Sequence, residues 1–227
     1  MSESILFPIA FIYYFVLIIV KFSAAAIFYK TYYDSKVNKL VLGASLLFLF
    51  SAISRIIMVI FDFPLTKFDS SLYQNYAIIW KIGYFINNMG YVCLIFISEI
   101  AILKKKSRFL ISIFYFISLI ISIVPIDIKT VQVISIIPST LAMIFIPLTY
   151  LFLAKYKTIR TRALAIFGGY ILFFTGSLIF IEEIVQVFIS LNPSQALNIR
   201  SLIHIISISV KIVGIGIMIY GYRKKLV

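Results

Sequence analysis

Long apolar segments joined by short connections make up almost all of this 227-residue chain. A helix needs roughly 20 mostly apolar residues to cross the hydrocarbon core of a bilayer. Seven segments approach or exceed this length, at residues 6–28, 40–61, 73–103, 109–124, 131–154, 163–191 and 202–222. They show no strand-like alternation, and backbone groups in lipid must find their hydrogen-bond partners internally. The sequence therefore predicts an all-α integral membrane protein, in which residues 1–227 form a single seven-helix transmembrane domain.

The composition argues against a soluble protein. Hydrophobic residues make up 63% of the chain and charged residues 13%, whereas soluble domains are about 45–50% apolar and about 25% charged. A soluble domain of this size must still cover a large surface with polar groups. The net charge of +13 would suggest nucleic acid in a soluble protein, but here the charges fall in short clusters between apolar runs. We therefore expect a lipid bilayer, and no nucleic acid, around this chain.

The connections alternate between strongly basic and weakly charged. Fourteen Lys and Arg residues fall on one set, and three fall on the other. The basic set is Lys30, Lys36, Lys39, Lys104, Lys105, Lys106, Arg108, Lys155, Lys157, Arg160, Arg162, Arg223, Lys224 and Lys225. The other set has Lys67, Lys129 and Arg200 beside Asp62, Asp69, Asp127, Glu182 and Glu183. Because short cytoplasmic loops are enriched in Lys and Arg, we expect a multi-pass protein of the cell membrane with its N-terminus outside and its C-terminus cytoplasmic.

Ionisable and amide side chains also occur inside the predicted spans. A charge at the bilayer centre costs at least ~2.5–3.5 kcal/mol on insertion scales, so such residues should face a bundle interior or a water-filled cavity. At about 100° per residue, those of the third span share one stripe, and those of the seventh span share one face. The candidates for a ligand pocket or a buried polar network are Arg55, Lys81, Asn88, Glu99, Glu183, Arg200, His204 and Lys211.

These two polar faces predict how the helices are arranged. We expect the third and seventh spans to be neighbours, with their polar faces turned toward each other. The expected pairs are Lys211 with Glu99 or another polar group of the third span, and Arg200 or Lys81 with Glu183. The fourth span has only hydroxyls among its polar groups, so we expect it to be a peripheral helix that faces lipid.

Each candidate also has a structural alternative. Lys21 can extend its ammonium group toward the basic side of the membrane, and Glu99 can pair with the basic cluster that begins at Lys104. Glu182 and Glu183 can be headgroup-level charges. The buried cations can form structural ion pairs rather than a binding site.

Several classes of enzyme are excluded by the residues present. A catalytic zinc site needs about three protein ligands, and the chain has one His and one Cys. Ser177 and His204 could meet as a nucleophile and a base, but the glycine-rich surround of such a serine is missing. There is also no phosphate loop. We therefore expect no enzymatic activity, no metal ion and no cofactor.

Two motifs suggest a family. Trp80-Lys-Ile-Gly-Tyr84, then Phe96-Ile-Ser-Glu99, a basic cluster and another apolar span together resemble the seven-transmembrane sensory input domains of prokaryotic histidine kinases and related receptors. The likeness covers about a third of the chain. It implies a seven-helix fold and a sensory role, and the lack of a kinase or other output domain implies a stand-alone sensor or accessory protein.

The predicted topology is also similar to that of microbial rhodopsins, because Lys211 lies in the middle of the last span. The retinal-site pattern of that family is missing. Ser207 stands where the family has a carboxylate, and Trp80 is the only tryptophan in the chain.

The leading functional prediction is a membrane sensor or receptor-like protein with an outward-facing polar pocket. It would bind a small molecule and signal to a separate cytoplasmic partner at its basic loops. The alternative is a small transporter or channel for an anion or proton, because buried Lys and Arg can bind anions and Pro138, Pro147 and Gly176 can act as hinges. The lack of an internal repeat counts against transport, and a retinal protein is a minor third possibility.

Overall fold

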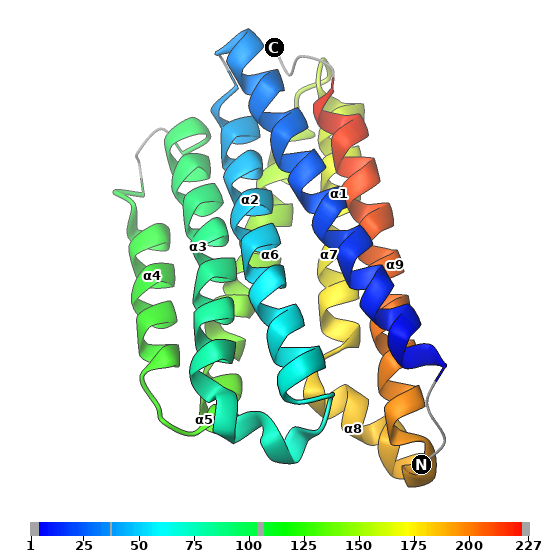
Figure 1. Ribbon diagram of the computed structural model, residues 1–227. Coiled ribbons are helices and arrows are strands. Elements are labelled where there is room, and N and C mark those ends of the chain that lie inside the picture. Colours follow the sequence, from blue (N-terminus) through cyan, green and yellow to red (C-terminus); the bar gives the residue numbers. More distant parts are fainter. Residues whose placement is uncertain (1–4, 37, 104–106, 224–227) are drawn as a thin grey trace.

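The computed structural model describes residues 5–36, 38–103 and 107–223, which form helices joined by short turns (Figure 1). The α-helices are α1 (Leu6–Ser35), α2 (Lys39–Ile60), α3 (Ala77–Ala101), α4 (Leu110–Ile123), α5 (Ile128–Ile134), α6 (Ile136–Leu153), α7 (Arg160–Ile179), α8 (Glu182–Leu191) and α9 (Ala196–Tyr222). A π-helical segment, η1 (Phe61–Leu65), extends α2, and two 3₁₀ segments, η2 (Ser70–Tyr76) and η3 (Pro193–Gln195), precede α3 and α9. The described residues contain no strand, so the helical fold class is confirmed.

Within the described residues, six helical segments are long and apolar enough to cross a membrane. They are Leu6–Asp34, Lys39–Leu65, Ser70–Ala101, Ile128–Leu153, Arg160–Ile179 and Pro193–Tyr222. The remaining predicted span corresponds to α4, which is apolar but has only 14 residues. At 1.5 Å per residue it is about 21 Å long, shorter than the roughly 30 Å of a bilayer core.

The six long segments form a closed ring. In order around the ring, α1 packs on α2, α2 on α3, α3 on α6, α6 on α7, α7 on α9, and α9 on α1. Helix α4 lies outside the ring against α3, as expected for a peripheral helix (Figure 1). The prediction that the third and seventh spans are neighbours is wrong. Helices α3 and α9 lie on opposite sides of the ring, separated by α1 and α2 on one path and by α6 and α7 on the other.

Glycines allow α7 and α9 to approach closely. A Cβ atom built on Gly214 of α9 would lie 2.7 Å from the carbonyl oxygen of Gly169 on α7 and 2.9 Å from the amide nitrogen of Phe173. Small residues at such positions let helix backbones come together, which is a common way of packing helices in membranes. This contact fixes α9 against α7 along much of its length.

Two prolines interrupt helices on the side of the bundle away from the basic connections. Pro64 cannot donate a hydrogen bond to the carbonyl of Ile60, and α2 changes there into the π-helical turn η1. Pro138 likewise leaves the carbonyl of Ile134 without its partner, and α5 ends at that residue. Pro147 lies within α6, which continues to Leu153.

The predicted span at residues 163–191 is not one helix. Helix α7 ends at Ile179, and α8 begins at Glu182 after an extended residue, Ile181. Helix α8 turns away from the bundle axis at the same end as η2 and α5 (Figure 1). Its first-turn acids favour a helix start at this point, because carboxylates stabilise the positive end of the helix dipole.

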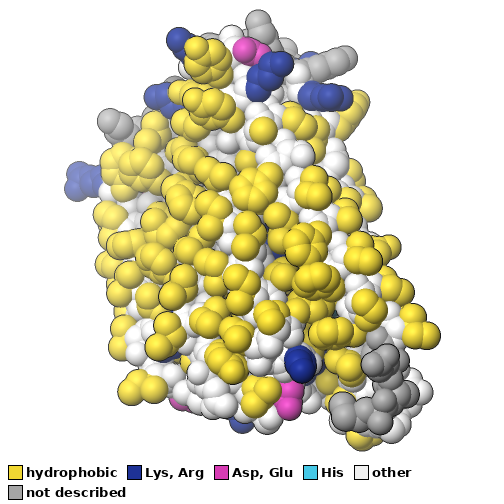
Figure 2. Space-filling view, viewed as in Figure 1, with side chains coloured by type: hydrophobic (Ala, Val, Ile, Leu, Met, Phe, Trp, Pro, Cys, Tyr) yellow, Lys and Arg dark blue, Asp and Glu magenta, His cyan; other side chains and the backbone are white. Residues whose placement is uncertain are grey.

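The surface is apolar around its middle and charged at its ends. Figure 2 shows hydrophobic side chains covering the middle of one face, with Lys and Arg gathered at the upper end. Large apolar side chains such as Ile19, Phe114 and Val213 are more than half exposed, as expected for groups that face lipid tails. Of the basic set, Lys104, Lys105, Lys106, Lys224 and Lys225 lie outside the described residues.

Candidate functional site: a polar cavity inside the helix ring

The helix ring encloses a cavity of about 320 Å³. All six ring segments contribute to it, together with η2, α5 and α8. Its charged lining residues are Lys21, Arg55, Asp62, Glu182, Glu183, Arg200 and Lys211, and His204 lines it too. Its hydroxyl and amide groups come from Ser51, Ser54, Asn87, Asn88, Gln132, Ser135, Ser139, Thr140 and Ser177. A volume of this size is within the lower range of small-molecule sites.

The cavity occupies only one half of the bundle. On α9 it is lined by Arg200, His204 and Lys211, which lie toward the end that carries α8. The other half of the ring is filled by aromatic side chains. Tyr150 and Tyr222 are fully buried, their hydroxyls are hydrogen-bonded to each other, and Tyr150 stacks on Tyr170. The cavity therefore ends beyond Lys211 at this packed aromatic core, on the side toward Tyr222.

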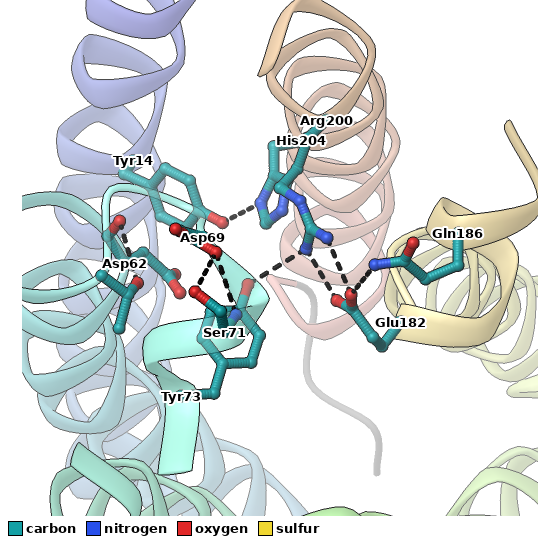
Figure 3. A network of polar contacts seen from close by, with 10 residues as sticks. Tyr14, Asp62, Asp69, Ser71, Tyr73, Glu182, Gln186, Arg200 and His204 are labelled. Atoms are coloured by element: carbon teal, nitrogen blue, oxygen red, sulfur yellow. Dashed lines mark hydrogen bonds and ion pairs between the residues drawn. The ribbon is translucent and has the colours of Figure 1, made fainter. Parts of the chain in front are cut away.

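An ion pair borders the outer part of the cavity, between α8 and α9. Arg200 donates two hydrogen bonds to Glu182, at 2.6 and 2.7 Å, and one to the hydroxyl of Tyr73, at 3.0 Å (Figure 3). Gln186 also donates to Glu182, at 2.6 Å. Burial acts to raise the pKa of Glu182, but the hydrogen bonds and the charge of Arg200 outweigh it and hold that pKa below its ordinary value of 4.5. Glu182 is thus an ionised partner of Arg200 at neutral pH.

His204 lies in an aromatic enclosure next to this ion pair. Its Nδ1 atom is hydrogen-bonded to the hydroxyl of Tyr14 on α1 (Figure 3). Its ring stacks on Phe68 at a centroid distance of 4.7 Å and lies 5.5 Å from that of Phe180. Only 6% of the residue is exposed. His204 therefore links α1, α9 and the α7–α8 connection.

The deep part of the cavity holds three cations with few acidic partners. Lys21 donates to the hydroxyl of Ser51 at 2.6 Å and to its carbonyl at 3.2 Å. The Lys211 ammonium lies 4.0 Å from the ring centroid of Phe180 and has no hydrogen-bond or ion-pair partner within the described ranges. Arg55 is 4.0 Å from a carboxylate oxygen of Asp62, which is the limit of an ion pair.

Six of the eight candidate residues line this cavity. They are Arg55, Asn88, Glu183, Arg200, His204 and Lys211. The expected pair of Arg200 with Glu183 is wrong. Arg200 binds the neighbouring Glu182, and Glu183 is exposed. Asn88 also has a packing role, since it accepts a hydrogen bond from Tyr115 of α4 at 2.6 Å.

The other two candidates lie elsewhere. Lys81 turns toward the α4–α5 connection and donates to the carbonyl of Pro125. Glu99 is fully buried and binds the start of α4, where it accepts hydrogen bonds from the amides of Ile111 and Ser112, at 3.2 and 2.9 Å, and from the hydroxyl of Ser107 at 2.6 Å. The expected pair of Lys211 with Glu99 is therefore wrong. Glu99 supplies the acceptor that the first-turn amides of α4 need.

Other residues of the cavity were not among the candidates. Lys21 does not extend toward the basic side of the membrane. It is buried, as is Tyr14, which lies two helical turns before it on the same face of α1. Trp80 and Tyr84 also line the cavity, and their rings stack at 5.2 Å. Together with Tyr73 and Tyr91 they repeat at helical spacing, which is the sequence signal for an aromatic wall.

The comparisons with known proteins add no relative. No family model matches this sequence, and neither a curated protein nor a solved structure matches it. In the part of the chain that the structure describes, no three His, Cys, Asp or Glu side chains come together as a metal site would need. The functional argument therefore depends on the cavity.

Proposed function

We propose that this protein is a seven-helix membrane sensor or receptor-like protein, with an outward-facing pocket for a small molecule. The observation that carries the proposal is that the cavity is one-sided. It is lined by polar groups in one half of the ring and stops at a packed aromatic core in the other half. A binding site of this shape can hold a ligand without offering it a passage.

The orientation follows from charge. We propose that α4 completes seven crossings of the cell membrane and that the cavity faces outward. The described basic residues at the ends of α1, α6 and α9 and at the starts of α2, α4 and α7 would then lie in the cytoplasm. The start of α1 and the end of α9 lie at opposite ends of the bundle, as an odd number of crossings requires (Figure 1).

Helix α9 is the best candidate to transmit a signal. It carries Arg200, His204 and Lys211 in the cavity and reaches the basic end at Tyr222. Because Gly214 packs against the backbone of α7, a ligand that moves α9 must also move or repack α7. The movement would reach a separate cytoplasmic partner at the basic connections.

A small transporter or channel for an anion or proton is the second candidate. The helix interruptions at η1, between α5 and α6, and between α7 and α8 favour it, since each adjoins a residue that lines the cavity. Discontinuous helices around a binding site are a feature of transporters.

Two measurements separate these functions. Proteoliposomes that hold the full chain are assayed for passage of chloride, acetate, glutamate and protons, and a sensor predicts the same rates as in empty liposomes. In the Cys93→Ala background, spin labels at Lys36→Cys and Arg223→Cys report the distance between the ends of α1 and α9. A sensor predicts that Lys211→Met changes this distance distribution. Protein-dependent flux that Lys211→Met abolishes would replace the sensor with the transporter.

A further inference from the structure

The deep half of the cavity has more positive than negative groups. Lys21, Arg55 and Lys211 line it, and Asp62 is the acidic group next to them. We propose that the cavity binds a small organic monoanion, with a carboxylate held among these three cations and an apolar body against the aromatic wall. This inference names the ligand class of the proposed pocket and therefore depends on it.

The contacts of Lys211 leave its positive charge without an acceptor in the described part of the chain. Lys211 is 3% exposed, and its ammonium contacts the face of Phe180. A cation–π contact offsets only part of the cost of holding a lysine ammonium at mid-bilayer depth. Water in the cavity can solvate this ammonium, and an anionic ligand can replace that water with a stronger, charge-assisted contact.

Lys21 has a similar need. Its hydrogen bonds go to the hydroxyl and carbonyl of Ser51, which are neutral acceptors. The Ser51 hydroxyl in turn donates to Asn87 at 2.9 Å, so the amide side chain fixes the direction of the serine. The Lys21 ammonium is thus held in place at the cavity by a polar chain without being neutralised.

The rest of the wall selects an organic molecule. Trp80, Met58, Met143, Phe174 and Leu178 line the cavity with apolar surface. An inorganic anion would leave this surface in contact with water, whereas an aliphatic or aromatic body would bury it. At the rim, the exposed Glu183 adds a negative charge that disfavours a second carboxylate on the ligand. A monocarboxylate with an apolar body fits both the deep cations and the apolar wall, and it places no second negative charge near Glu183.

Trp80 makes the proposal directly measurable, because it is the only tryptophan of the chain and lines the cavity. The full chain in lipid nanodiscs is titrated with benzoate and hexanoate, with benzamide and hexanamide as uncharged matches, and with sulfate. We expect a saturable change in Trp80 emission with the carboxylates alone. Lys211→Met and Lys21→Met should each weaken the apparent affinity by about tenfold or more, the usual effect of removing one charge of a buried pair.

Lys81→Met is the matched control. Lys81 is also a lysine in a spanning helix, but it contacts Pro125 outside the main cavity, so its loss should leave benzoate binding unchanged. Lys211→Arg keeps the charge and should retain binding, which separates lost charge from misfolding. Equal responses to benzoate and benzamide, or to benzoate and sulfate, would overturn the proposal.

The outcome for the ligand is distinct from the outcome for the sensor. If benzoate binds and also crosses proteoliposome membranes in a Lys211-dependent way, the ligand class stands and the sensor is wrong. If no carboxylate changes Trp80 emission while Lys211→Met still alters the distance between the ends of α1 and α9, the sensor stands and the ligand class is wrong.

Discussion

At the scale of single residues, the chain holds its buried charges in two different ways. Arg200 has a bidentate carboxylate partner and a tyrosine hydroxyl, and it is 4% exposed. Lys211 is as deeply buried, but among the described residues its ammonium has the face of Phe180 beside it and no hydrogen-bonded or acidic partner. Removing one partner of a buried pair destabilises the fold because it leaves the other charge uncompensated, whereas a buried charge that already lacks a partner costs free energy, part of which a ligand can recover. Arg200 is therefore held in a structural ion pair, and Lys211 is the cation left for the ligand that we propose.

The Arg200–Glu182 pair should contribute measurably to stability. Glu182→Gln leaves the guanidinium with a weaker acceptor, and we expect it to lower the free energy of unfolding by about 1–3 kcal/mol. The side chain of Glu182 is 23% exposed, which keeps the loss below that of a fully buried pair. Thermal unfolding in detergent measures it. Glu183→Gln is the control, because Glu183 is exposed, and its change should be within about 0.5 kcal/mol. Equal losses for the two variants would contradict the assignment.

The same pair predicts a dependence on pH. Arg200 holds the pKa of Glu182 below 4.5 in the folded protein, despite burial, which acts to raise it. A carboxylate with a lowered pKa in the folded state stabilises the fold above its unfolded pKa and loses that effect as pH falls through the folded pKa. The stability difference between wild type and Glu182→Gln should therefore be constant near neutral pH and shrink below about pH 4.5. A difference that grows on acidification would contradict the lowered pKa.

At the scale of helices, the contact between α7 and α9 links the deep part of the cavity, at Lys211, to the basic end of the bundle. Gly169 and Gly214 meet through their backbones, and Gly176 lies against the stem of Lys211. Close backbone packing of this kind is specific, because any side chain at the contact must push the helices apart.

Gly214→Ala tests this contact. The new Cβ atom would lie under 3.0 Å from two backbone atoms of α7, so the helices must separate, and we expect a loss of about 1–3 kcal/mol in unfolding free energy. Gly216→Ala on the same helix is the matched control, since nothing lies within 4 Å of its added Cβ. It should be neutral or stabilising by up to about 1 kcal/mol through helix propensity. Similar unfolding temperatures for the two variants would show that α7 and α9 are not packed through these glycines.

The helices illustrate what a sequence can and cannot predict. Apolar length predicted the helical class and most helix positions, and Pro138 marks the break between α5 and α6. The break at Phe180 was not predicted because residues 163–191 contain no proline, although Glu182 and Glu183 mark the start of α8. Phe180 at the break contacts His204 and Lys211, which are distant in the sequence. Helical spacing also predicts which residues share one face of a helix, but it does not predict which neighbouring helix that face contacts.

The stripe on α3 shows this limit for the candidate site. Asn88 reaches the cavity, while Glu99 binds the start of α4 and Lys81 reaches the connection beyond it. The stripe is wide enough to contact three neighbouring elements, and only the order of helices around the ring decides which side chain meets which. Spacing along the sequence relates residues of one helix only. It therefore could not show that Lys21 of α1 meets residues of other helices in the cavity.

At the scale of the whole molecule, two asymmetries coincide. Most described Lys and Arg residues outside the cavity gather at one end of the bundle, whereas Lys67, Lys81 and Lys129 lie at the other end, with the cavity, η2, α5 and α8. If the basic end is cytoplasmic, then the half of the ring with the cavity faces outward, and the aromatic core around Tyr150 and Tyr222 seals the inner half. The proposed direction of the cavity therefore depends on the charge distribution alone.

Labelling of single cysteines in intact cells tests that direction. In the Cys93→Ala background, which removes the one native thiol, Ser194→Cys places a thiol in the exposed turn between α8 and α9, and Lys157→Cys places one in the exposed basic turn between α6 and α7. Because basic connections are retained in the cytoplasm, we expect a membrane-impermeant maleimide to label Ser194→Cys and to label Lys157→Cys only after the cells are made permeable. The reverse pattern would turn the cavity toward the cytoplasm, and its ligand would then be an intracellular molecule. Labelling of both sites in intact cells would mean that the membrane does not lie between these two turns, and the multi-pass arrangement itself would be wrong.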